Sequence, residues 1–374
     1  MHTSPGSLFL RRSARSYRRV ARTLLAFTVC LLLASALRLH AAPAEHEDVL
    51  KRWSGKSPTE LRAAAEAGNA EAQHSLANTL FKGTNSSPGQ MAECIQWLQR
   101  AADQNLAVAQ AGLGKAYFEG KVVPQNYPAA WKWMRAAAAQ ELPFALNYLG
   151  IAHLNGWGTR ADATEAVRWY RAAVAKGDPY AMFNLSWLMQ RGQGGLPPDA
   201  SAALKLLRQA ADAGHAQAQA ELGWKLRYGL DGPYDLAAAV GWFRKSADQG
   251  YAPGQVHLGH AYALGFVGTP DLTAALSLYR KAADQGSADA AFALAELYAS
   301  GEGSPRDAAD SVNALYERAA EGGNHSASAR FAERLRWGYG GVTDRLKACG
   351  YYCLALGGIG STDVFGLLTH DGRI

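Results

Sequence analysis

From residue 57 onward, apolar and small residues return at helical spacings of three and four, and the whole pattern repeats every 36 or 37 residues. A glycine follows each alanine-rich helical pattern and marks this period: Gly83, Gly120, Gly156, Gly192, Gly229, Gly265, Gly301 and Gly338. A fixed period of this length is typical of helical repeats that stack on their neighbours. The sequence therefore predicts an all-α, right-handed solenoid of about eight helix–turn–helix repeats.

Each unit contains two helical patterns with recognisable ends. In the first pattern, a small residue such as Gly114 follows the repeat leucine and predicts close approach of another helix, while the closing glycine suits a left-handed C-terminal cap. An acid or amide six or seven residues later is expected to cap the second helix: Asn126, Asp162, Asp199, Asp235, Asp271, Asp307 and Asp344. Before the first unit, Ser57 and Glu60 predict a capping box and a lone capping helix to about Ala67.

The remaining segments differ from the repeats in composition. We assign residues 57–357 to the repeat array with its capping helix, 45–56 to a linker and 358–374 to a glycine-rich tail. Residues 1–44 carry seven arginines and no acid, then an uncharged apolar run at 23–37 and the sequence Ala-Pro-Ala at 42–44. This order is typical of a secretory signal peptide, so we expect a periplasmic or secreted protein. An uncleaved membrane anchor at 23–37 is the main alternative, and an organellar presequence is another.

The basic leader also explains the overall charge. The chain has a formal net charge of +6, but without residues 1–44 there are 31 Lys and Arg against 32 Asp and Glu. The remaining chain is close to neutral, which argues against a nucleic-acid partner. Contact with a membrane is expected only through the N-terminal segment, if it stays uncleaved.

Segments 169–192 (WYRAAVAKGDPYAMFNLSWLMQRG) and 280–309 (RKAADQGSADAAFALAELYASGEGSPRDAA) resemble the Sel1-like repeat, a relative of the tetratricopeptide repeat. The resemblance covers about 300 residues. It implies an adaptor or assembly role with a protein or peptide partner. Some cysteine-rich members bind or hydrolyse β-lactams and recognise cell-wall peptides, but their regular cysteine pairs are missing here. A membrane-tethered part of a quality-control or secretion complex is a third reading.

The sequence contains no catalytic motif, so we expect no enzyme, cofactor or metal site. His257 and His260 share a helical face but lack an acid one turn away, and we expect them to be structural. Cys94 and Cys349 are interpreted as small buried residues at the position of Ala166, and a Cys349–Cys353 disulfide would lie at the geometric limit of a helix.

The positions that the repeat does not fix are the candidates for binding. In such helix pairs the first helix lines the concave face, and residues two before, two after and five after the repeat leucine are expected to face the groove. The predicted partner-binding residues are Asn147, Ile151, Phe183, Trp187, Trp224, Arg227 and His260. Aromatic residues and arginine are the usual binding anchors, and Arg227 suits an acidic group of the ligand. Alternatively, the rings fill a tightly wound superhelix.

Two positions test the register of the repeat. Leu222 is the repeat leucine of a central unit, so its replacement by alanine is expected to cost about 2–5 kcal/mol. Asp231 lies in a predicted loop, and its replacement by alanine is expected to cost less than about 0.5 kcal/mol.

Overall fold

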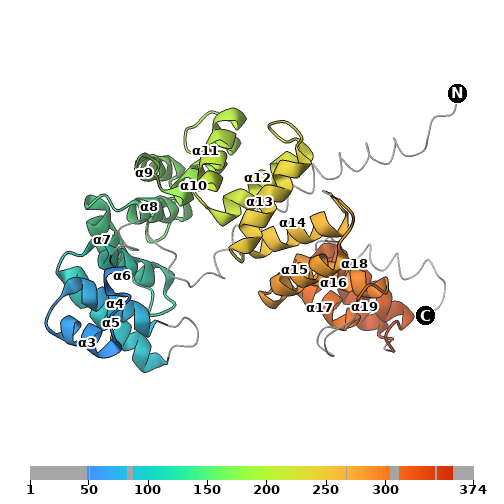
Figure 1. Cartoon of the computed structure of the whole chain (residues 1–374), viewed down its shortest axis with the longest axis horizontal. Coiled ribbons are helices and arrows are strands. Elements are labelled where there is room, and N and C mark those ends of the chain that lie inside the picture. Colours follow the sequence, from blue (N-terminus) through green and yellow to red (C-terminus); the bar gives the residue numbers. More distant parts are fainter. Residues whose placement is uncertain are drawn as a thin grey trace. The chain divides into compact units, whose positions relative to one another are not determined.

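The computed structural model describes residues 49, 51–81, 87–266, 268–303, 311–341 and 343–356. All regular secondary structure in these residues is helical, which confirms the predicted class. The chain divides into two compact units, one through Asp178 and one from Pro179 onward, and its helices follow one another in pairs within each (Figure 1).

The first unit holds one capping helix and three helix pairs. Its helices are α3 (Pro58–Glu66), α4 (Ala70–Leu80), α5 (Pro88–Asp103), α6 (Ala107–Glu119), α7 (Tyr127–Ala139), α8 (Pro143–Asn155) and α9 (Ala163–Ala175). The second unit holds five pairs. Its helices are α10 (Pro179–Arg191), α11 (Ala200–Asp212), α12 (Ala216–Tyr228), α13 (Leu236–Asp248), α14 (Ala252–Ala263), α15 (Leu272–Asp284), α16 (Ala288–Ala299), α17 (Val312–Glu321), α18 (His325–Trp337) and α19 (Arg345–Ala355).

The helix ends follow the predicted local signals. The side chain of Asp235 caps α13 by accepting a hydrogen bond from the backbone N–H of Ala238, and Asp271 caps α15 in the same way. Gly229, after α12, has φ of 61°, the left-handed conformation that glycine adopts without strain. Ser57 and Glu60 form the predicted capping box of α3. Gly83 and Asp307 lie outside the described residues.

The small residue after the repeat leucine allows the predicted close approach of the second helix. A Cβ at Gly150 would lie 2.5 Å from the ring of Tyr170, and a Cβ at Gly223 would lie 2.7 Å from the ring of Phe243. Both rings are almost completely buried. A side chain at either glycine would therefore displace a core aromatic residue.

A pair of glutamines joins neighbouring helix pairs at several junctions. Gln219 near the start of α12 donates to the carbonyl of Ala211 in α11, and Gln249 at the end of α13 donates to Gln219 Oε1 at 2.7 Å. The buried Gln219 thus connects three helices, α11, α12 and α13. The pairs Gln73 with Gln104, Gln110 with Gln140, and Gln255 with Gln285 repeat the contact.

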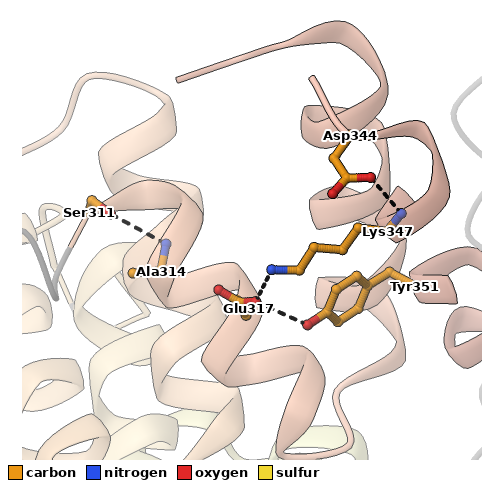
Figure 2. Close-up of polar contacts among 6 residues, drawn as sticks. All are labelled: Ser311, Ala314, Glu317, Asp344, Lys347 and Tyr351. Atoms are coloured by element: carbon orange, nitrogen blue, oxygen red, sulfur yellow. Dashed lines mark hydrogen bonds and ion pairs between the residues drawn. The ribbon is translucent and has the colours of Figure 1, made fainter. Parts of the chain in front are cut away.

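The described ends of the array are held by polar contacts. Residues 51–53, inside the segment expected to be a linker, are helical, and Arg52 forms an ion pair with Glu71 of α4 at 2.8 Å. At the other end, Glu317 of α17 accepts hydrogen bonds from Lys347 Nζ at 2.6 Å and from the Tyr351 hydroxyl at 3.3 Å (Figure 2). These contacts fix α19 on the preceding pair.

The cysteines differ from the prediction in one respect. Cys94 is 3% exposed, as expected, and burial raises the pKa of its thiol to about 11. The position of Ala166, four residues after the capping Asp162, corresponds in α19 to Ala348, four residues after Asp344. Ala348 is buried, while Cys349 is half-buried one position later. The assignment of Cys349 to the buried position was therefore wrong by one residue.

Among the described residues, no helix has the length and apolar character needed to span a bilayer. The proposed leader and its apolar run at 23–37 lie outside the described residues.

Candidate partner-binding surface

Within each unit, one pair of neighbouring first helices comes closer together than the second helices do. Within the first unit α6 approaches α8, and within the second unit α12 approaches α14, while successive second helices come less close in the described residues. In a curved stack, the helices that lie nearer to one another are on the concave side. The residues of α8, α10, α12 and α14 that point away from their second helices therefore form the predicted inner surface.

In the first unit, the two predicted binding residues lie on α8 and differ in burial. Asn147 is only 5% exposed, so it lies in the core and offers little surface to a partner. Ile151, one turn later, is half-buried. The inner surface of this unit therefore retains only Ile151 from the predicted set.

In the second unit, α10 carries two predicted aromatic residues with different surroundings. The ring of Phe183 is half-buried and lies 5.1 Å from the ring of His215, which caps the start of α12. Trp187 is also half-buried, and the guanidinium of Arg191 lies over its ring at 3.9 Å. Phe183 thus packs along the edge of the core, whereas Trp187 is covered by an exposed arginine.

The remaining predicted residues come together around the end of α12. Trp224 lies 5.3 Å from Tyr228, ring centre to ring centre, and Tyr228 is 51% exposed. The guanidinium of Arg227 lies 4.9 Å from the Tyr228 ring and 4.7 Å from the ring of Phe266 after α14. His260 of α14 meets Tyr279 edge-on at 5.4 Å. Trp224, Arg227 and Phe266 therefore gather around the exposed ring of Tyr228, and Arg227 lies close enough to His260 to lower the pKa of that histidine.

Charged groups between α10 and α12 were not identified from the sequence. Burial raises the pKa of Glu221, and the nearby Lys225 and Arg191 oppose that rise. Lys225 is itself buried and forms an ion pair with Asp231 at 2.7 Å, and Asp231 also accepts a hydrogen bond from Gln190. Asp231 thus joins α10 to α12, which overturns the expectation that it is an unconstrained loop residue.

One contact of this network, between Trp187 and Arg191, could have been predicted from the sequence. Trp187 and Arg191 are four residues apart on one helix, a spacing that places a cation over a ring. Asp231, by contrast, has a left-handed backbone with φ of 61°, and its contact with Lys225 depends on how the loop turns back on α12. No helical period reveals such a contact.

The comparisons with known proteins agree with this architecture. The Sel1 repeat model matches seven consecutive segments: residues 70–106, 107–142, 143–178, 179–215, 216–251, 252–287 and 288–324. No curated protein matches the chain. A solved structure of a protective antigen from uropathogenic Escherichia coli strains, with an SLR fold, is 28% identical, has a TM-score of 0.58 and aligns over 85% of this chain and 68% of its own.

A Sel1 repeat protein from Oxalobacter formigenes is 25% identical, with a TM-score of 0.53 over 91% of this chain and 99% of its own. Each matched segment corresponds to one first helix and one second helix, from α4 and α5 to α16 and α17. The pair α18 and α19 continues the array beyond the last matched segment, so the described residues hold eight pairs, as predicted.

Proposed function

Since the chain belongs to the Sel1 repeat family, we propose that it is an exported, non-enzymatic scaffold that binds a protein or peptide on the inner surface of the described residues of the second unit. The observation that carries the proposal is the partial exposure of the rings of Trp187 and Trp224. Both rings lie on first helices and both are half-buried. Arg191 lies over the ring of Trp187, and Trp224 contacts the exposed ring of Tyr228. Large rings that keep accessible area on a concave surface are typical binding anchors.

The proposed ligand is an extended segment or a helix with apolar anchors. Such segments fit elongated grooves because successive anchors meet successive repeats. Trp187 and Trp224 belong to adjacent repeats, 179–215 and 216–251, so one segment can contact both.

A second-helix tryptophan provides a matched control. Trp242 of α13 is half-buried like Trp187, and the ammonium of Lys245 lies over its ring at 4.0 Å. It therefore has the same chemistry on the outer side of the array. The two tryptophans differ mainly in the helix that carries them.

The test compares wild type with Trp187→Ala, Trp224→Ala and with Trp242→Ala as bait for proteins of the host, after circular dichroism and melting curves show that all three are folded. Loss of specific partners from the double variant alone is expected, because truncating a central anchor typically costs about 2 kcal/mol or more of binding free energy. An unchanged set of partners would place the binding surface elsewhere.

Export is supported by the order of the basic, apolar and Ala-Pro-Ala segments in residues 1–44. Fractionation of the host and sequencing of the mature N-terminus test it. A released protein that begins near Glu45 is expected. An uncut, membrane-bound protein would favour the tethered alternative, in which the scaffold serves a membrane complex.

A further inference from the structure

Arg227 has no acidic partner in the described part of the chain. Its guanidinium contacts the faces of Tyr228 and Phe266, and no described carboxylate lies within ion-pair distance. The side chain is half-buried between these rings. A guanidinium that is partly removed from water and contacts only rings retains unused hydrogen-bond donors.

A histidine without a partner lies nearby on α14. The Nδ1 atom of His257 is buried and makes no hydrogen bond within the described residues. Its ring packs at 5.0 Å against Phe243 of α13. A buried ring nitrogen without a partner costs free energy. The His257 side chain as a whole is half-buried, so another part of its ring stays accessible to a ligand.

The basic side chains lie within electrostatic reach of one another. The pKa of His257 falls to about 4, first because of burial and then because of repulsion from His260 and Arg227. Burial also lowers the pKa of His260, and Arg227 adds to this shift. Both histidines are consequently neutral at pH 7, but each gains a proton more readily when a negative charge arrives.

The other charged and titratable groups around them come from two elements. Tyr279 of α15 packs on His260 and is buried. Asp289 of α16 raises the pKa of His260 slightly, but its carboxylate already accepts a hydrogen bond from Asn324 at 2.8 Å. The cluster therefore presents basic groups in excess over acids.

We propose that Arg227, His257 and His260 form a subsite for the side-chain carboxylate of an aspartate or glutamate in the bound segment. The proposal rests on the proposed function and adds the chemistry of one anchor. The planar guanidinium suits a carboxylate in a two-point contact, and the rings of Tyr228 and Phe266 restrict its motion. A protonated histidine beside it adds a further charged donor.

The subsite makes binding depend on pH in a defined direction. A bound carboxylate raises the pKa of the histidines, so binding takes up a proton, and affinity increases as the pH falls from 7.5 to 5.5. The carboxyl group of the ligand stays ionised over this range because its ordinary pKa is near 4.

The experiment is a selection of random peptides on the full-length mature protein, followed by affinity measurements with synthetic peptides. The synthetic peptides carry a C-terminal amide, so that a carboxylate comes only from a side chain. Each selected peptide is compared with its Glu→Gln or Asp→Asn analogue. The subsite variants are Arg227→Met, the charge-keeping Arg227→Lys and the double variant His257→Gln, His260→Gln. The double variant Trp187→Ala, Trp224→Ala tests the inner surface, and Arg244→Met is a matched arginine of the same repeat.

We expect selected peptides that combine apolar residues with an acid. Affinity should fall about 10- to 100-fold in Arg227→Met or when the acid is replaced, and less in Arg227→Lys, because charge-assisted hydrogen bonds are lost. Arg244→Met should bind as wild type does. The rise in affinity at lower pH should disappear in the double variant His257→Gln, His260→Gln. Melting curves establish that each variant is folded.

The two proposals fail in different ways. The carboxylate subsite is overturned, and the scaffold function stands, in either of two cases. In the first, the selected peptides need Trp187 and Trp224 but carry no acid. In the second, the peptides bind Arg227→Met as tightly as they bind wild type. If no peptide is enriched, or if binding does not depend on Trp187 and Trp224, both proposals fail.

Discussion

The two units use aromatic side chains in different ways. In the first unit, Phe118 is 2% exposed, and its ring lies 5.6 Å from the rings of both Trp131 and Trp157. The polar ends of this cluster are bonded, since Trp131 Nε1 donates to the Trp157 carbonyl and the Tyr148 hydroxyl donates to Glu119 at 2.7 Å. In the second unit, Trp187 is half-buried under Arg191, and Trp224 is half-buried beside the exposed ring of Tyr228.

The difference separates two roles for residues of one chemical type. A ring surrounded by other rings, with its polar atoms bonded, contributes to folding and presents little to a partner. A ring covered by an arginine side chain retains area that a ligand can bury after the arginine moves. The cluster around Phe118 therefore contributes to stability, and we expect Trp187 and Trp224 to contribute to binding.

The largest effect on stability is expected in the closed cluster. Phe118→Ala should destabilise the protein by about 3–5 kcal/mol, because it removes a fully buried ring and leaves a cavity between Trp131 and Trp157. Denaturant unfolding of wild type and variant measures the change. A loss below 1 kcal/mol would show that the cluster is not a core.

Stability should fall at acidic pH because His257, whose Nδ1 atom makes no hydrogen bond within the described residues, resists protonation in the folded protein. His257 has an ordinary pKa of 6.5 and a pKa of about 4 in the folded protein, so between these values the unfolded state binds more protons. Its contribution is complete above pH 6.5 and is lost as the pH falls towards 4, on the order of 3 kcal/mol.

Urea unfolding of wild type and His257→Gln at pH 7.5, 6.0 and 5.0 measures this contribution. The fall in stability should be shallower in the variant. Parallel curves for the two proteins would mean that His257 titrates as it does in the unfolded chain.

Asp231→Ala should be more harmful than a loop position suggests. The change leaves the buried ammonium of Lys225 without its carboxylate and places alanine at φ of 61°, so we expect a loss of about 1–3 kcal/mol. Asp231→Asn, which tolerates this backbone conformation and still accepts a hydrogen bond, should lose less. Melting curves compare both variants with Leu222→Ala, which we expect to lower the free energy of unfolding by about 2–5 kcal/mol. A neutral Asp231→Ala would restore the original expectation.

The smallest effect on stability is expected at the open surface. Trp187→Ala removes a half-buried ring whose face is covered by Arg191, so it should cost less than about 1 kcal/mol. The same unfolding assay serves as the measurement, with Phe118→Ala as the reference. If Trp187→Ala destabilises the protein as much as Phe118→Ala does, then Trp187 is a core residue and the contrast between the units disappears.

Local signals allowed most of the fold to be predicted. The spacing of small and apolar residues, the closing glycines and the capping acids act within a few residues, so they could be found in the sequence. The site was harder to predict because its contacts join residues from different repeats. The hydrogen bond from Gln190 to Asp231 and the grouping of Arg227 with His257 depend on loop and helix placement that the period does not encode.

The position of Asn147 illustrates the same limit. A rule based on distance from the repeat leucine assigned it to the groove, but residues two before that leucine are buried at Asn147, Ala220 and Val256. The turn of the helix points this position towards neighbouring helices. Residues two after the leucine, such as Trp187 and Trp224, remain partly accessible.

The most direct test of the proposed binding surface uses a photoreactive amino acid at position 187, 224 or 242 of the protein in its host. The three sites carry the same native residue, and only Trp242 lies on a second helix. Covalent adducts of one common partner at 187 and 224, and none at 242, are the result that we predict. Adducts formed equally at all three positions, or only at 242, would contradict binding on the inner surface.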